Sequence, residues 1–169
     1  AGVTKSRGAE WQKWKKFNAA EDISDEEAQK LMDEGYQPLP TQWIETDKNE
    51  PLRVPGGEYV PPKYKSRLVA RGDLDNLDVR SDSPTCEIEA QNLIFSFASS
   101  KKLRIKSADI TNAYFQGELL DRLMLLRVDI PGKEGQYVIA RVPIYGTKDA
   151  GRQFWKRLRQ VMLEAGFKE

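Results

Sequence analysis

The stretch SADITNAYFQG, residues 107–117, places one carboxylate, Asp109, five residues before an aromatic hydroxyl, Tyr114. Residues 103–109 alternate in a pattern that predicts a strand ending at Asp109, and a strand end often carries a metal-binding carboxylate. On spacing alone an Asp in this position is more often a turn or helix cap, so both roles stay open. Tyr114 is likewise compatible with a simple packed turn.

A second chemical feature is the segment KYKSRLVARG, residues 63–72. Its strand-like alternation puts four cations on one face: Lys63, Lys65, Arg67 and Arg71. One interpretation is an edge strand whose charges prevent pairing with other chains. The other is a ribbon that contacts phosphate, which is favoured because no acid interrupts the row of cations.

The residue counts exclude several chemistries. The sequence has no histidine and a single cysteine, Cys86, so zinc-finger ligand sets, Ser-His-Asp triads and Cys-His pairs cannot form. Cys86 precedes an apolar helical run and is expected to be a reduced, half-buried thiol. Any catalysis must therefore use carboxylates, hydroxyls, Lys, Arg or a metal.

Composition and charge narrow the class of protein. The 169 residues are 39% hydrophobic and 31% charged, which is typical of a soluble globular protein. No apolar run approaches the roughly 20 residues of a membrane span, so no membrane partner is expected and an intracellular protein is the simplest interpretation. Residues 101–169 carry fourteen Lys or Arg against eight Asp or Glu, which indicates either a polyanionic partner or solvated helix faces.

Four helices are predicted around these segments. Trp11 and Trp14 share one side of a basic helix, and Ser24 with Glu27 forms a capping box for the second. Ser83 is expected to cap the third helix. The apolar residues of the third and fourth helices are expected to form buried faces: Ile88, Leu93, Ile94, Phe97 and Ala98, and then Phe154, Trp155, Leu158, Val161, Met162 and Ala165.

Four segments, in order, resemble the reverse transcriptase domain of copia-type LTR retrotransposon Pol polyproteins. YKSRLVARG resembles the family's fingers strand, SPT its short link, ADITNAYFQGEL its first catalytic motif, and VIARVPIYGTKDAGRQFW its LYGLKQAPR block. The resemblance runs from about Glu10 to Phe167. Four ordered matches are more specific than any single motif.

The resemblance implies an RNA-directed DNA polymerase that transfers nucleotides to a primer 3'-hydroxyl by a two-metal mechanism. Asp109 and the backbone carbonyl of Ile110 would bind Mg²⁺, with Mn²⁺ left open. Tyr114 would lie under the incoming sugar and exclude a 2'-hydroxyl. The other implied contacts are Lys65 and Arg67 with the triphosphate, Tyr145 and Gly146 with the nascent base pair, and Arg71, Lys148 and Arg152 with nucleic acid.

The implied partners are an RNA or DNA template-primer, a dNTP, and the remainder of the Pol polyprotein with its downstream palm, RNase H and integrase. The implied location is an intracellular cytoplasmic particle, with a nuclear stage left open. Thr147, Asp149 and Gly151 depart from the family pattern, so a looser turn is expected there. The family's third motif, an aromatic-x-Asp-Asp hairpin, should follow Phe167, and the sequence has no adjacent Asp-Asp pair.

The predicted fold is α+β, the fingers and front palm of a right-hand polymerase. Residues 1–58 are expected to form N-terminal helices and a loop or hairpin, and residues 59–169 the fingers strand and an incomplete palm that is inactive alone. Strands from Leu103 to Asp109, Leu123 to Val128 and Tyr137 to Pro143 should form an antiparallel sheet, with helices 86–100 and 150–165 on one face and Asp109 on the other side or at the rim. The alternatives are a non-catalytic remnant that binds nucleic acid or a protein partner, and a structural module with solvated basic residues.

Overall fold

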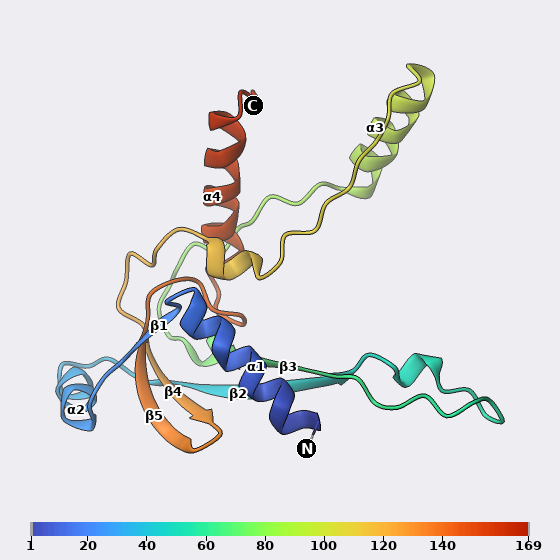
Figure 1. The fold of residues 1–169 in the computed structure, drawn as a ribbon. Coiled ribbons are helices and arrows are strands. Elements are labelled where there is room, and N and C mark those ends of the chain that lie inside the picture. Colours follow the sequence, from blue (N-terminus) through green and yellow to red (C-terminus); the bar gives the residue numbers. More distant parts are fainter. Residues whose placement is uncertain (1, 169) are drawn as a thin grey trace.

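The computed structural model describes residues 2–168 and has an α+β fold built on one curled, five-stranded sheet (Figure 1). The strands lie in the order β1-β5-β4-β2-β3. Neighbours are antiparallel except β2 and β4, which run parallel with Leu39 opposite Leu126. The sheet is therefore mixed. The predicted antiparallel arrangement is confirmed where β4 pairs with β5 and is wrong where β4 pairs with β2. The strands are β1 (Ala20–Asp22), β2 (Leu39–Asp47), β3 (Tyr64–Ala70), β4 (Leu125–Ile130) and β5 (Lys133–Ala140).

Four α-helices accompany the sheet within the described residues: α1 (Gly2–Lys16), α2 (Asp25–Asp33), α3 (Ile88–Ser100) and α4 (Ala150–Glu164). The predicted capping box of α2 is confirmed, since Ser24 Oγ accepts from the Glu27 amide at 3.2 Å and Glu27 Oε2 accepts from the Ser24 amide at 2.9 Å. No helix between residues 2 and 168 is long and apolar enough to cross a membrane.

The main core lies between α1 and the sheet. Trp14 is only 1% exposed and packs with buried side chains such as Leu68, Leu126 and Val138. Helix α1 also packs on β3. This strand lies at the edge of the sheet, as the edge-strand interpretation of residues 63–72 predicted. Ser6 Oγ accepts from the Ser66 amide at 2.8 Å and so satisfies one donor of that edge. The N-terminal helix is therefore an integral part of the sheet domain.

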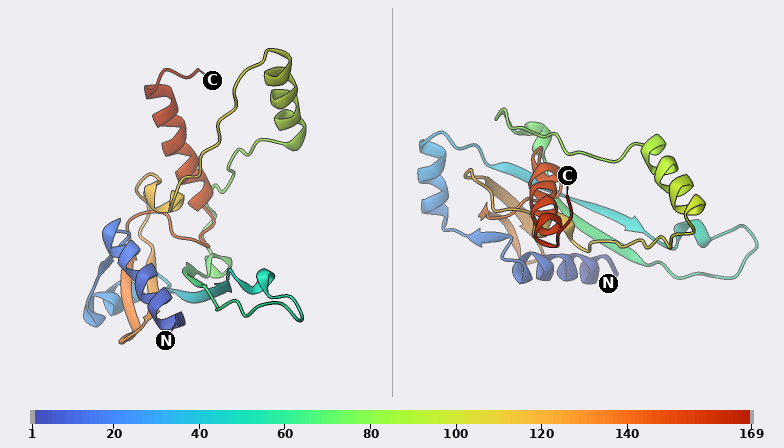
Figure 2. Two further views of the ribbon diagram at one scale, coloured as in Figure 1. Left: turned by 45° about the vertical axis from the view of Figure 1, so that its right-hand side comes forward. Right: turned by 90° about the horizontal axis from the view of Figure 1, so that it is seen from above.

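Helices α3 and α4 project away from the sheet instead of covering it (Figures 1 and 2). On α3, Ile88 and Leu93 are each 71% exposed and Phe97 is 57% exposed. On α4 the expected face is half-buried at Phe154, Trp155 and Leu158 and exposed at Val161, Met162 and Ala165. The prediction that both helices pack on one sheet face is wrong. The amphipathic patterns correctly predicted two helices, but such a pattern does not show which part of the protein packs on the apolar face.

The predicted strand from Leu103 to Asp109 is also wrong, because residues 103–110 form no strand and are exposed. Alternation allows a strand, but a strand needs a neighbour to receive its backbone hydrogen bonds. Helix α3 begins at Ile88 without a side-chain cap, and Ser83 Oγ instead donates to the Gly151 carbonyl at 3.2 Å. Cys86 is exposed, not half-buried.

Strands β2 and β3 pair from Thr41–Ala70 to Asp47–Tyr64, across the boundary predicted at residue 58. Both predicted parts of the chain thus contribute strands to the same sheet.

Candidate functional site

A cavity of about 220 Å³, here called the Asp109 cavity, gathers side chains from segments far apart in the sequence. Strand β3 contributes Lys65 and Arg67, the segment after α3 contributes Asp109 and Ile110, and the turn after β5 contributes Tyr145. Thus five of the residues predicted to form a site lie in one wall. The remaining lining residues are Glu10, Lys13, Thr111, Asn112 and Ala113.

The two cations of β3 face the cavity because they are two positions apart on one strand. The Arg67 guanidinium carbon lies 5.6 Å from the centroid of the Tyr145 ring, within the range of a cation–π contact. Repulsion from Arg67, followed by burial, lowers the pKa of Lys65 from its usual value of 10.5. The positive charges of this wall are therefore incompletely compensated, and an anion bound there would relieve their repulsion.

Asp109 supplies an exposed carboxylate that forms no hydrogen bond or ion pair with residues 2–168. Its oxygens and the neighbouring Ile110 carbonyl are hard ligands of the type that Mg²⁺ prefers. Within the described residues no three Asp, Glu, Cys or His side chains are grouped so that they could hold a metal ion. The donor set therefore fits part of a magnesium site, and further oxygen ligands are needed to complete it.

Tyr114 lies beside the cavity but does not line it. It belongs to a 3₁₀ helix, Ala113–Gln116, which buries Phe115 in the core and leaves Tyr114 half-buried. The Tyr114 and Tyr145 ring centroids are 5.0 Å apart. Burial also raises the pKa of Tyr145 above its usual value of 10.0, so the Tyr145 phenol is neutral at ordinary pH.

The turn at Tyr145 and Gly146 is fixed against the end of β3. The Ala70 amide donates to the Tyr145 carbonyl at 2.8 Å. Gly146 has a φ of +91°, and a Cβ at this position would lie 2.2 Å from the Ala70 carbonyl oxygen. Only glycine meets both requirements. Thr147 of this turn is buried, and its Oγ1 donates to the Ile144 carbonyl at 3.0 Å. Whether the turn is looser than in other family members stays a prediction.

The three predicted nucleic-acid contacts do not line the Asp109 cavity. Arg71 pairs with Asp73 through two hydrogen bonds of 2.9 and 2.8 Å. Lys148 Nζ donates to the Asp75 carbonyl at 2.5 Å, and Arg152 forms a 2.7 Å ion pair with Asp82. Each cation has an internal partner in this structure.

Glu10 and Lys13 are site residues that sequence reasoning missed. Glu10 is 2% exposed, and its Oε2 accepts from Lys13 Nζ at 2.7 Å. A signal was present, because Glu10 lies four residues before the buried Trp14 and so on the same helix face.

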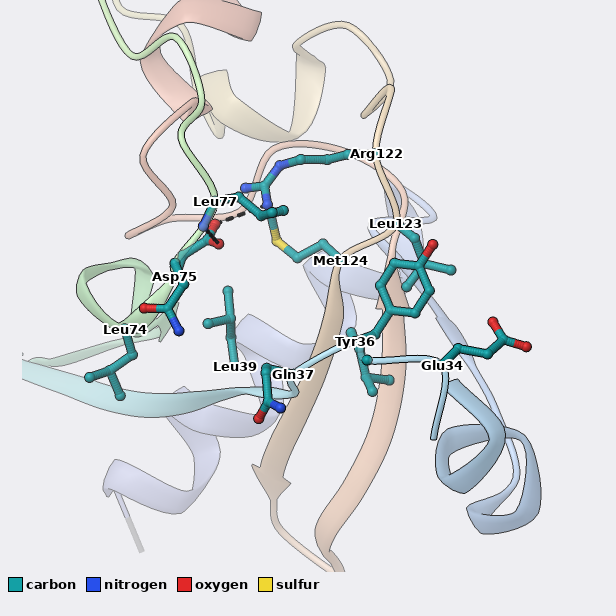
Figure 3. A pocket seen from close by; sticks show the side chains of 13 residues that line it. Glu34, Tyr36, Gln37, Leu39, Leu74, Asp75, Leu77, Arg122, Leu123 and Met124 are labelled. Carbon is teal, nitrogen blue, oxygen red and sulfur yellow. Dashed lines mark hydrogen bonds and ion pairs between the residues drawn. The ribbon is translucent and has the colours of Figure 1, made fainter. Parts of the chain in front are cut away.

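A separate cavity of about 260 Å³ lies between the end of α2, the start of β4 and the loop after β3 (Figure 3). Its walls include Leu39, Leu77 and Met124, and its one cation, Arg122, pairs with Asp75 at 2.9 Å. Arg122 also bonds to Asp149. This cavity shares no lining residue with the Asp109 cavity, and none of its lining residues was predicted to form a site.

Comparison with known proteins gives consistent matches. Residues 30–169 match the family described as reverse transcriptase (RNA-dependent DNA polymerase). The chain is 25% identical over 134 residues to a retrovirus-related Pol polyprotein from transposon TNT 1-94 of Nicotiana tabacum, covering 76% of this chain and 10% of that protein. It is 31% identical over 111 residues to one from transposon RE2 of Arabidopsis thaliana, covering 62% of this chain and 8% of that protein.

A third relative is a truncated transposon Ty1-A Gag-Pol polyprotein of Saccharomyces cerevisiae, 24% identical over 123 residues, with 68% of this chain and 10% of that protein covered. The chain thus spans no more than about a tenth of the length of these relatives. No solved structure matches it. The extent of the family match and the agreement among the relatives establish that the chain belongs to the reverse transcriptase (RNA-dependent DNA polymerase) family, in its copia-type branch.

Proposed function

We propose that this chain forms the fingers and front palm of an RNA-directed DNA polymerase within a retrotransposon Pol polyprotein. The observation that carries the proposal is the Asp109 cavity, where an unpaired carboxylate lies in the same wall as Lys65 and Arg67. Nucleotidyl transfer needs this combination, because cations must bind the triphosphate while oxygen ligands hold metal ions beside the reacting phosphate.

In this proposal Lys65 and Arg67 bind the triphosphate of an incoming dNTP. Arg67 is held over the Tyr145 ring, so its guanidinium is directed before the nucleotide arrives. Lys65 is repelled by Arg67, and an anionic ligand would offset this repulsion. Neither group transfers a proton; both orient the phosphates and offset their charge.

Asp109 and the Ile110 carbonyl would provide part of a Mg²⁺ site, and Mn²⁺ would accept the same oxygens. When bound, such ions lower the pKa of the primer 3'-hydroxyl and stabilise charge on the phosphates. The missing ligands would come from other parts of the Pol protein. We therefore expect residues 1–169 alone to be inactive.

Tyr114 would select the sugar. Its ring is fixed against Tyr145 at 5.0 Å and against Phe154 at 6.4 Å, so it cannot easily move away from an added 2'-hydroxyl. The template-primer would lie beyond the cavity, with Arg71, Lys148 and Arg152 exchanging or sharing their internal partners with phosphates. The intracellular, cytoplasmic location stays a prediction.

The apolar faces of α3 and α4 support a place within a larger assembly. Leu93 and Phe97 of α3 and Met162 of α4 are exposed, and large apolar side chains exposed along a helix often mark an interaction surface. We propose that other parts of the Pol polyprotein, including the rest of the palm, cover these helices.

The decisive experiment is Mg²⁺-dependent primer extension by a Pol protein that contains this region. Asp109→Asn should reduce extension to background, because the amide keeps the shape of the side chain but loses its charge. Asp78→Asn is the matched control, since Asp78 is also an exposed Asp but lies outside the cavity. Full activity of Asp109→Asn, or extension by residues 1–169 alone, would refute the proposed role of Asp109.

A further inference from the structure

Helix α1 contributes two charged side chains to the Asp109 cavity, although it lies outside the residues that match the reverse transcriptase family. Glu10 and Lys13 are both part of the cavity wall, together with Lys65 and Arg67 of β3. The question is whether this contribution is structural or belongs to ligand binding.

The position of Glu10 is rigid. Ser6, Glu10 and Trp14 are spaced four residues apart and so share the face of α1 that packs on the sheet domain. Ser6 Oγ accepts from the Ser66 amide at 2.8 Å and donates to the Tyr64 carbonyl at 3.2 Å, while Trp14 is 1% exposed. The carboxylate between them has little freedom to move.

Because Glu10 is buried, its carboxylate needs the ion pair with Lys13. A carboxylate that is 2% exposed loses almost all hydration, which is costly unless a cation compensates it. Lys13 provides this compensation at 2.7 Å, while its own side chain keeps 38% exposure. One end of the pair is therefore fixed inside the protein, and the other is presented to the cavity.

Lys13 completes a row of three cations. It joins Lys65 and Arg67, and its charge adds to the repulsion that Lys65 experiences. The three cations outnumber the two carboxylates that line the cavity, Glu10 and Asp109. A chain of phosphates carries several charges and could contact all three groups at once.

We propose that Lys13 is a third phosphate-binding residue of the Asp109 cavity, with the triphosphate of a nucleotide as its ligand, and that Glu10 is the residue that positions it. This inference rests on the proposed function of the cavity. It assigns a binding role to the N-terminal helix, in addition to its role in the core.

The first test measures binding of inorganic tripolyphosphate to residues 1–169 by calorimetry. Lys13→Met should weaken binding about tenfold, the loss expected for one hydrogen bond to a charged group. Lys13→Arg should retain affinity within about twofold, because it keeps the charge and the donors. Lys15→Met is the matched control, since it removes the same charge from an exposed position of α1 outside the cavity.

The second test separates positioning from simple charge. Glu10→Gln removes a negative charge, so electrostatics alone predicts tighter binding of tripolyphosphate. Positioning predicts weaker binding, and it predicts no further weakening when Glu10→Gln is added to Lys13→Met. Glu10→Asp keeps the charge but shortens the side chain, and should also weaken binding. Tighter binding by Glu10→Gln, or unchanged binding by Glu10→Asp, would overturn the positioning role.

The outcomes also distinguish this inference from the proposed function. If Lys65→Met weakens tripolyphosphate binding and Lys13→Met does not, Lys13 is not a phosphate-binding residue while the cavity remains a phosphate site. If neither variant changes the affinity, the cavity is not a phosphate site and both proposals fail. Thermal unfolding of each variant checks that the fold is intact.

Discussion

Two regions of the molecule use similar apolar residues with opposite results. In the sheet domain, Leu126 of β4 is 0% exposed and packs beneath α1 with Trp14. In the arm that carries α3, Leu93 is 71% exposed and Phe97 is 57% exposed. Both regions have regular secondary structure, but within residues 2–168 the large apolar side chains of α3 stay exposed and only Ala98 of that helix is buried. Secondary structure is therefore not evidence that a region contributes to a core.

The helix ends differ in the same way. Helix α2 begins with a complete capping box formed by Ser24 and Glu27, so its N-terminus is stabilised locally. Helix α3 begins after Glu87, whose side chain makes no capping hydrogen bond. Helix α3 thus has neither the capping hydrogen bonds of α2 nor the extensive side-chain burial of the sheet strands. We therefore expect α3 to be less stable than the sheet domain.

The largest effect should come from a matched pair of leucines. Leu126→Ala should lower the free energy of unfolding by about 2–5 kcal/mol, because it removes buried apolar surface and leaves a cavity. Leu93→Ala should change it by less than about 0.5 kcal/mol, the usual range for exposed positions. Urea unfolding of both variants measures the difference. If both variants lose the same free energy of unfolding, Leu93 of α3 is buried in solution and the proposed difference between the two regions is wrong.

The difference between local and distant interactions explains which elements could be predicted from the sequence. The capping box of α2, the strand at β3 and the helices α3 and α4 follow from neighbouring residues, whose periodicity or hydrogen bonds are local. The strand predicted at residues 103–109 failed because strand formation depends on a distant partner. On α3 the predicted burial is confirmed at Ala98 but is wrong at Ile88, Leu93, Ile94 and Phe97, for the same reason.

The candidate site shows the same division. Lys65, Arg67, Asp109 and Tyr145 could be selected from their motifs, and they line one cavity. The spacing of Glu10 from Trp14 places Glu10 on the buried face of α1, but the approach of Glu10 and Lys13 to β3 depends on how α1 packs across the sheet. The internal partners of Lys148 and Arg152 could not be predicted from the sequence either, since they lie about 70 residues away along the chain.

A smaller effect should separate the two helix N-termini. Ser24→Ala should lower the free energy of unfolding by about 1 kcal/mol, because the Glu27 amide loses its acceptor. Glu87→Ala at the start of α3 should change it by less than about 0.5 kcal/mol, since no capping bond is lost. Urea unfolding of the two variants tests the comparison, and a larger loss for Glu87→Ala would reverse it.

The smallest expected effect is local and depends on pH. Asp47, at the end of β2, closes the loop of residues 48–63: its Oδ1 accepts from the Asn49 amide at 3.0 Å and the Lys63 amide at 2.8 Å, and Arg53 pairs with Oδ2. Desolvation opposes ionisation of this carboxyl, but the hydrogen bonds, first that from Arg53, outweigh it and hold the pKa of Asp47 below 3.8.

Because the folded pKa of Asp47 is the lower one, its contribution to loop stability is present above pH 3.8 and is lost as the pH falls through the folded pKa. The amides of Asn49 and Lys63 should therefore show a step in chemical shift and faster hydrogen exchange below pH 3.8, without a matching step in the α3 amides. Asp47→Asn should remove the step and give faster exchange at these amides at neutral pH. If the amides of Asn49 and Lys63 follow the same pH curve in Asp47→Asn as in the unaltered chain, the loop is held by something other than the Asp47 carboxylate.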